Sequence, residues 1–230
     1  MKISYISIFP EIFKSFLTTS LIAKAQDKKL LSFECTNPRD FCEDKHKQVD
    51  DEIYGWWTGL LMKAQPLIDA VESVIKTNKL SKRCKRRRIV FLSPSKDIFC
   101  QNHAHEFAKM KHIIFVCARY EGIDYRFEQY MIDQYPKHFA KISLGKFITL
   151  GGEVPAMTMT ESIVRLIPNV IKEENSRKDE SYSIEKNMNN LEYPQYTRPD
   201  VVEGYKVPEI LLSGNTKKIE EWKMENTIPL

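Results

Sequence analysis

Short apolar runs alternate in the first two thirds of this chain with segments whose apolar residues recur at helical spacing. The runs cover residues 3–8, 31–35, 89–92, 113–117 and 147–150, and the helical patterns lie around 13–21, 67–75 and 99–110. Each run has the length of a buried strand. Because strands that are separated by helices pair in parallel, the pattern predicts an α/β domain with a mostly parallel sheet.

The composition changes after residue 168, where a stretch rich in Lys, Glu, Asp, Asn and Ser begins. Such a stretch has too few apolar residues to form a core and is typical of a linker. The chain has 230 residues, which is enough for one large domain and a small one. We expect a large domain over 1–168, a linker over 169–190 and a small, mostly helical domain over 191–230.

Charge and cysteine content narrow the class of protein. The net charge is only +4, so a polyanionic partner is permitted but not required. The five cysteines include no CxxC pair, which argues against a disulfide framework or a thiolate zinc site and favours the reducing cytoplasm. No apolar run approaches the roughly 18 residues of a membrane span. A basic run at 82–88 is either a phosphate-binding segment or a solvated connector.

Two segments at predicted strand ends are candidates for a ligand site. Residues 145–155 lead into the pair Gly151-Gly152, and residues 117–124 place an arginine, a tyrosine and carboxylates after a buried strand. Ligands of open parallel sheets bind at the carboxyl ends of the strands. The alternatives are an ordinary glycine turn and a surface network of arginine with carboxylates. Signatures of dinucleotide, ATP and serine-hydrolase sites are absent from the sequence.

Ordered motifs along nearly the whole chain resemble those of one enzyme family. They are Val49-Asp50-Asp51, Tyr54-Gly55, Gly59-Leu60-Leu61-Met62, Leu92-Ser93-Pro94, Arg119-Tyr120-Glu121-Gly122-Ile123-Asp124, Gly151-Gly152-Glu153-Val154-Pro155-Ala156-Met157-Thr158, Tyr193-Pro194-Gln195-Tyr196-Thr197-Arg198-Pro199 and Leu211-Leu212-Ser213-Gly214-Asn215 with Trp222. In this order they resemble the bacterial tRNA (guanine-N1)-methyltransferases, the TrmD family.

The resemblance implies a SPOUT-type α/β domain with a C-terminal trefoil knot, which the apolar pattern alone would not predict because chain connections rarely thread loops. It also implies a homodimer with its active site at the subunit interface, S-adenosylmethionine as methyl donor and tRNA as partner. The implied reaction methylates N1 of the guanosine at position 37. A requirement for Mg²⁺ stays open, and the sequence offers no metal-binding cluster of its own.

The resemblance assigns site residues by their match to the family's motifs. The donor would be bound by Leu92, Ser93, Pro94, Ala118, Arg119, Tyr120, Glu121, Gly122, Leu144, Gly145, Lys146, Phe147, Ile148, Thr149, Leu150, Gly151, Gly152 and Pro155. The substrate would be bound by Asp50, Tyr54, Gly55, Gly59, Ser176 and Ser181.

Two further residues would carry the chemistry. Guanine N1 holds a proton at neutral pH, so a base must remove it while charge develops on O6. The family's proposed base is an aspartate in the linker, which is matched here by Glu180, and its assisting arginine is matched by Arg165. Without the resemblance, Glu180 would be an ordinary linker residue and Arg165 a helix-terminal cation.

The chain departs from the family's pattern at several donor-loop positions. Lys96, Ala118, Lys146 and Leu150 replace smaller or acidic residues there. In a substrate-facing loop, Trp56 and Trp57 replace glycines and would either stack on the target base or block the pocket. Residues 136–141 look inserted, and the helical tail is shorter than the family's. The departures define an alternative function: a catalytically impaired relative that keeps the dimeric fold and binds RNA or a partner without methyl transfer.

Overall fold

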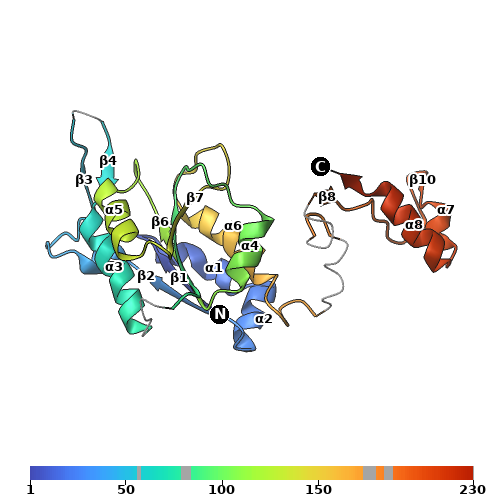
Figure 1. Cartoon of the computed structure of the whole chain (residues 1–230), viewed down its shortest axis with the longest axis horizontal. Helices are drawn as coiled ribbons and strands as arrows, with labels where there is room; N and C mark the ends of the chain where they lie inside the picture. Colours follow the sequence, from blue (N-terminus) through green and yellow to red (C-terminus); the bar gives the residue numbers. More distant parts are fainter. Residues whose placement is uncertain (56–57, 79–83, 173–179, 184–188, 230) are drawn as a thin grey trace. The chain divides into compact units, whose positions relative to one another are not determined.

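The computed structural model describes residues 1–55, 58–78, 84–172, 180–183 and 189–229 (Figure 1). The chain divides into two compact units, Met1–Ile171 and Lys172–Leu230. The first unit holds the sheet and the loops at its carboxyl edge, and it is described first. Among the described residues, no helix is both long and apolar enough to cross a bilayer.

Five parallel strands form the sheet of the first unit. Their order is β2 (Ser32–Thr36), β1 (Lys2–Ile6), β6 (His112–Cys117), β5 (Arg87–Leu92) and β7 (Phe139–Ile142). Every residue of the central strand β6 is buried. The α/β class with a parallel sheet, predicted from the alternation of runs, is therefore confirmed.

Helices cover both faces of the sheet (Figure 1). On one face lie η1 (Pro10–Phe13), α1 (Lys14–Leu17), α2 (Ser20–Asp27), α4 (Gln101–Ala108) and α6 (Glu153–Val164). On the other lie η2 (Pro38–Phe41), α3 (Ala64–Thr77) and α5 (Tyr125–Gln134). Each face buries its own apolar cluster, so the first unit has three layers.

One expected strand is wrong. Residues 147–150 form an exposed loop, in which Ile148 is 80% and Leu150 91% exposed. The fifth strand is instead β7, whose sequence Phe-Ala-Lys-Ile carries a charge and gave no apolar run. An edge strand pairs on one side only and tolerates a polar residue, which explains why its pattern was weak.

A hairpin is hydrogen-bonded to the predicted arginine-tyrosine-carboxylate loop. Strands β3 (Asp50–Glu52) and β4 (Leu60–Met62) pair antiparallel. Backbone hydrogen bonds join Glu121 N to Leu60 O at 3.0 Å and Met62 N to Gly122 O at 2.9 Å. The hairpin is thus anchored to the loop that follows β6. Trp56 and Trp57 lie outside the described residues.

The basic run 82–88 is not a uniformly solvated segment. Lys82 and Arg83 lie outside the described residues, and Lys85 and Arg86 are exposed. Arg87 begins β5 and is fully buried, with its guanidinium 5.3 Å from the centre of the Tyr135 ring. Arg88 pairs with Glu106. Within the described part of the run, only Lys85 and Arg86 therefore present unburied, unpaired charge to a phosphate.

The second unit is small and has little apolar burial. It contains the strand pairs β8 (Asn190–Leu191) with β11 (Ile228–Pro229) and β9 (Val201–Val202) with β10 (Tyr205–Lys206), and the helices α7 (Glu209–Leu212) and α8 (Thr216–Asn226). Trp222 packs edge-on against Tyr193 at 6.2 Å. No described residue of α7 or α8 is buried.

Candidate active site

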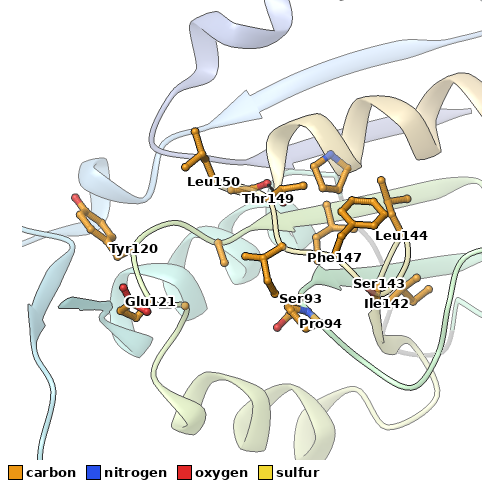
Figure 2. A pocket seen from close by; sticks show the side chains of 17 residues that line it. Ser93, Pro94, Tyr120, Glu121, Ile142, Ser143, Leu144, Phe147, Thr149 and Leu150 are labelled. Atoms are coloured by element: carbon orange, nitrogen blue, oxygen red, sulfur yellow. Dashed lines mark hydrogen bonds between the residues drawn. The ribbon is translucent and has the colours of Figure 1, made fainter. Parts of the chain in front are cut away.

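Three loops enclose a cavity of about 360 Å³ in the first unit (Figure 2). They follow β5, β6 and β7, so the cavity lies at the carboxyl ends of neighbouring parallel strands. In Figure 2, Tyr120 and Glu121 lie on the side of the cavity opposite Leu144 and Phe147, and Ser93 and Pro94 lie between the two groups. Backbone groups and side chains of all three loops are therefore available to one ligand.

The cavity gathers most of the residues that the sequence assigned to a donor site. It is lined by Leu92, Ser93, Pro94, Ala118, Tyr120, Glu121, Gly122, Ile142, Ser143, Leu144, Phe147, Ile148, Thr149, Leu150, Gly151, Gly152 and Pro155. Arg119, Gly145 and Lys146 were assigned to the site but do not line it. Ile142 and Ser143 were missed, since they belong to the end of a strand that the apolar pattern did not predict. That the gathered residues bind a methyl donor stays a prediction.

The pair Gly151-Gly152 allows the loop after β7 to pass directly against the loop after β6. Gly152 N donates to Ala118 O at 3.0 Å, and a Cβ added at Gly152 would lie 2.7 Å from Cys117 Cα. A Cβ added at Gly151 would lie 2.4 Å from Arg119 Nε. The first of these neighbours is backbone and cannot rotate away. Glycine is therefore required at position 152 by close packing.

Arg119 does not line the cavity, because its side chain pairs with the buried Glu153. Its Nε lies 2.9 Å from Oε2 of Glu153, which begins α6 and is fully buried. Ser7 Oγ donates to Glu153 Oε1 at 2.6 Å, and the Arg119 guanidinium lies 4.9 Å from the centre of the Phe9 ring. A buried carboxylate needs such partners, so this cluster fixes the base of the Arg119–Gly122 loop.

Part of the expected substrate site adjoins the cavity. Gly59 lies directly against the Glu121 side chain, which lines the cavity. Partial burial and the neighbouring Asp50 carboxylate raise the pKa of Tyr120 above its usual value. Tyr120 has a φ of 56°, in the left-handed region that costs a bulky residue energy. The hairpin thus places Asp50 beside a strained, cavity-lining tyrosine and Gly59 beside a cavity-lining glutamate.

The remaining expected substrate residues belong to different parts of the chain. Tyr54 is 95% exposed beside Gly55 in the hairpin turn. Ser181 belongs to the second unit, where its Oγ accepts a hydrogen bond from Glu192 N at 2.9 Å. Ser176 lies outside the described residues. Tyr54 and Gly55 thus belong to the first unit and Ser181 to the second, and their roles in substrate binding stay predictions.

The two expected catalytic residues belong to different units. Arg165 is half-buried and follows the last residue of α6, with its N–H bonded to Glu161 O at 3.2 Å. Glu180 is half-buried in the second unit, in a turn that its carbonyl closes by accepting from Ser183 N at 3.2 Å. Their roles in catalysis remain predictions.

The side chains that line the cavity suit an organic ligand with a flat apolar part and a positive charge. Leu92, Pro94, Ile142, Leu144 and Pro155 supply apolar walls, and Glu121 supplies a carboxylate. The volume is within the range of ligand sites, which is about 300–1,000 Å³. Among the described residues, no group of three or more His, Cys, Asp or Glu side chains is arranged to hold a metal ion.

Comparisons with known proteins identify the family. The family model described as "tRNA (Guanine-1)-methyltransferase TrmD" matches residues 1–229. A tRNA (guanine-N(1)-)-methyltransferase of Bacillus pumilus is 42% identical over 228 residues, covering 99% of this chain and 87% of the relative. Those of Bacillus subtilis and Dictyoglomus turgidum are each 40% identical, and the alignments cover 88% and 85% of them. The chain belongs to the TrmD family of tRNA (guanine-N1)-methyltransferases.

Proposed function

We propose that this protein transfers a methyl group from S-adenosylmethionine to N1 of the guanosine at position 37 of tRNA. The observation that carries the proposal is the cavity at the carboxyl ends of β5, β6 and β7, in a chain that matches tRNA guanine-N1 methyltransferases over nearly its full length. The class of reaction, guanine-N1 methylation of tRNA, follows from these relatives. The position in the tRNA and the residue roles are our proposals.

The cavity fits S-adenosylmethionine in size and in chemistry. The apolar walls made by Leu92, Ile142 and Leu144 suit the faces of an adenine ring. Glu121 supplies a negative charge for a cationic ligand, and the close-packed loop at Gly151-Gly152 exposes backbone groups to it. When bound, the donor supplies an electrophilic methyl group on a sulfonium.

We assign proton removal from guanine N1 to the Glu180 carboxylate and stabilisation of the developing O6 charge to Arg165. A carboxylate can accept the N1 proton as the ring becomes nucleophilic, and a guanidinium can donate to the oxygen that gains charge. Glu180 stands where the family has aspartate, so its carboxylate reaches one methylene further. Sensitivity to position is high, since a shift of about 1 Å can cost on the order of a hundredfold in rate.

We also propose that the loops around the cavity form a trefoil knot and that two copies of the chain form a dimer with the active site between them. The exposed apolar side chains of Phe147, Ile148, Leu150 and Val154 support the dimer, because an apolar patch at the rim of a site marks an interaction surface. Glu180 and Arg165 would then act at this interface.

The domain boundaries and the setting of the protein complete the proposal. We keep a methyltransferase domain over 1–168, a linker over 169–190 and a tRNA-binding domain over 191–230. The cysteines at positions 35, 42, 84, 100 and 117 are all free, which supports a cytoplasmic location. A role for Mg²⁺ is left to experiment.

The alternative of an impaired relative required the altered loop residues to close the donor site. Lys96 and Lys146 are exposed and do not line the cavity. Leu150 lines it but is 91% exposed, and Ala118 adds only a methyl group. These positions leave the cavity open, which favours the active enzyme.

The deciding experiment measures transfer of labelled methyl from S-adenosylmethionine to a tRNA transcript with guanosine at position 37. The matched control transcript carries adenosine at that position. We expect label on the guanosine transcript only. Label on both transcripts, or on neither when the protein is folded, would contradict the proposal.

The base assignment has its own test in Glu180→Gln. The amide cannot accept the N1 proton at neutral pH, so turnover should fall by about 10²–10⁴-fold with nearly unchanged donor affinity. Glu203→Gln, a change at an exposed carboxylate of the same unit, is the matched control. Full turnover in Glu180→Gln would remove Glu180 from the mechanism.

A further inference from the structure

A cysteine, a histidine and an aspartate that are close in sequence form a cluster of contacting side chains near the donor cavity. Cys100 is exposed and directly precedes α4. Its Sγ lies 3.3 Å from His103 Nδ1, and His103 Nε2 lies 3.2 Å from Asp97 Oδ1. None of these residues lines the cavity or has a role in the proposed methyl transfer.

The contacts assign one tautomer to the neutral histidine. His103 Nδ1 accepts a hydrogen bond from Cys100 N–H at 3.2 Å, so this nitrogen carries a lone pair. The proton is then on Nε2, which lies 3.2 Å from Asp97 Oδ1. The single lone pair of Nδ1 is shared between Cys100 N–H and the Cys100 thiol, whose Sγ lies 3.3 Å away. The ring stacks on Phe99, whose ring centroid lies 6.1 Å away.

This arrangement has the parts of an activated nucleophile. A thiol that can pass its proton to a neighbouring base reacts as thiolate, and a third group that orients the base completes the unit. The amino terminus of α4, an eight-residue helix, adds a positive dipole end at the same sulfur. Cys35 provides the contrast in geometry: it is also exposed, but among the described residues no histidine is hydrogen-bonded to its sulfur, whose pKa is raised to about 11 by partial burial and the charge of Glu34.

We propose that Cys100, His103 and Asp97 form a thiol–disulfide exchange site that accepts a low-molecular-weight disulfide. His103 Nδ1 takes the thiol proton, and the Cys100 sulfur attacks one sulfur of the disulfide. A new S–S bond forms to Cys100, the old S–S bond breaks, and the leaving thiolate accepts the proton from His103. Protein thiol and free disulfide become mixed disulfide and free thiol, so no other oxidant is needed.

The site is coupled to the donor cavity through the loop that it terminates. Ser93 and Pro94, at the start of this loop, line the cavity. Near its end, Asp97 O accepts from Ser143 N at 2.9 Å and Phe99 N donates to Ser143 O at 2.8 Å, and Ser143 also lines the cavity. A group attached to Cys100 displaces His103 and loosens the hold on Asp97. We therefore expect the mixed disulfide to bind the methyl donor less tightly, a consequence that rests on the proposed function.

The test of the exchange site incubates the full chain with oxidised glutathione at pH 7 and follows each labelled cysteine peptide by mass spectrometry. We expect Cys100 to be labelled at least about tenfold faster than Cys35. His103→Asn keeps an acceptor for Cys100 N–H but supplies no base, so it should slow the labelling of Cys100 about tenfold and leave Cys35 unchanged. Asp97→Asn should slow it by a smaller factor. Equal labelling of Cys100 and Cys35, or full labelling in His103→Asn, would overturn the proposal.

The coupling is tested by equilibrium binding of S-adenosylmethionine to the same protein before and after exchange. We expect affinity to fall several-fold in the mixed disulfide, to return after reduction with dithiothreitol, and to be insensitive to glutathione in Cys100→Ser. Unchanged affinity in the fully exchanged protein would overturn the coupling. A protein that exchanges rapidly at Cys100 but binds no donor even when reduced would instead contradict the proposed function and leave the exchange site standing.

Discussion

The two ends of the five-stranded sheet are built in opposite ways. In the amino-terminal half of the strands, polar side chains are connected and wholly or partly buried: Ser4 Oγ lies 2.6 Å from His112 Nε2, and Nζ of the half-buried Lys2 lies 2.6 Å from Oε2 of the half-buried Glu34. Ser4 and His112 are almost fully buried. At the carboxyl ends, an open cavity is bordered by exposed apolar side chains, among them Ile148 and Leu150.

The difference shows where this fold stores stability and where it leaves surface for a ligand. Buried polar groups that satisfy one another stabilise a single arrangement, whereas loops at strand ends are free to present backbone and side chains. The carboxyl end has only one deeply buried charged cluster, formed by Glu153 with Arg119 and Ser7, among the described residues. It lies below the cavity, so it fixes the loops without occupying the site.

The largest difference between the two ends of the sheet should be in the free energy of unfolding when one arginine at each end is replaced by methionine. Arg119→Met leaves the Glu153 carboxylate buried without its ion pair, so the free energy of unfolding should fall by about 3 kcal/mol. Arg87→Met, at the start of β5, removes a buried guanidinium whose nitrogens have no hydrogen-bond acceptor among the described residues, and should cost no more than about 1 kcal/mol. Urea unfolding of both variants measures the difference. Equal losses would show that the two arginines play the same part.

The next effect concerns close packing beneath the cavity. In Gly152→Ala the added methyl group meets the backbone of Cys117, so the loop after β7 must move and donor affinity should fall by at least about 100-fold, or about 2.7 kcal/mol. Gly145→Ala is the comparison variant: its methyl group meets the Phe147 ring rather than backbone, so the loop need not move and a smaller loss is expected even though Phe147 lines the cavity. Calorimetric titration with S-adenosylmethionine measures both. Similar affinity in the two variants would refute the packing argument.

The amino-terminal half of the sheet should respond to pH through His112. Burial lowers the pKa of His112 to about 4, so the folded protein holds it neutral while the unfolded chain binds a proton below about pH 6.5. Its contribution is present above pH 6.5 and is lost as pH falls towards 4. Between pH 6.5 and 5 the free energy of unfolding should drop by about 2 kcal/mol from this residue.

His112→Gln isolates that effect, because an amide can still bond to Ser4 but does not titrate in this range. Urea unfolding at several pH values should give a flatter profile for the variant than for the parent protein. The Glu34 carboxylate, whose pKa is lowered by its hydrogen bonds to Lys2, Ser4 and Asn78, adds acid sensitivity that both proteins share. Parallel profiles would show that His112 does not set the acid limit.

The sequence predicted this architecture wherever a local pattern reflected burial on both faces. The runs at 89–92 and 113–117 became β5 and β6, because central parallel strands are apolar throughout. The run at 147–150 became an exposed loop, and its apolar side chains lie at the cavity rim instead. Local patterns cannot distinguish a side chain buried in the core from one exposed at a ligand or partner surface.

The site followed a similar rule. The motifs predicted the loops that line the cavity. They did not predict that Arg119 turns inward to Glu153, which is also bonded to Ser7, a residue 146 positions away in sequence. Ser143 lines the cavity at the end of β7, a strand that carried too weak a pattern to be predicted. The cluster of Cys100, His103 and Asp97 was not predicted, although its members lie within seven residues of one another. The helix-spaced apolar residues of that segment predicted only a helix.

The smallest expected effect is on tRNA binding at the amino-terminal edge. Only exposed cations release counterions from phosphate, so Lys85→Gln with Arg86→Gln should lower the slope of log affinity against log salt by up to about 2. Arg88→Gln should change it less, because Arg88 already pairs with Glu106. Filter binding of tRNA at several salt concentrations measures the slopes. A larger change for Arg88→Gln than for the exposed pair would mean that the ion pair with Glu106 opens to bind RNA, and the amino-terminal end of the sheet would then share in function with the carboxyl end.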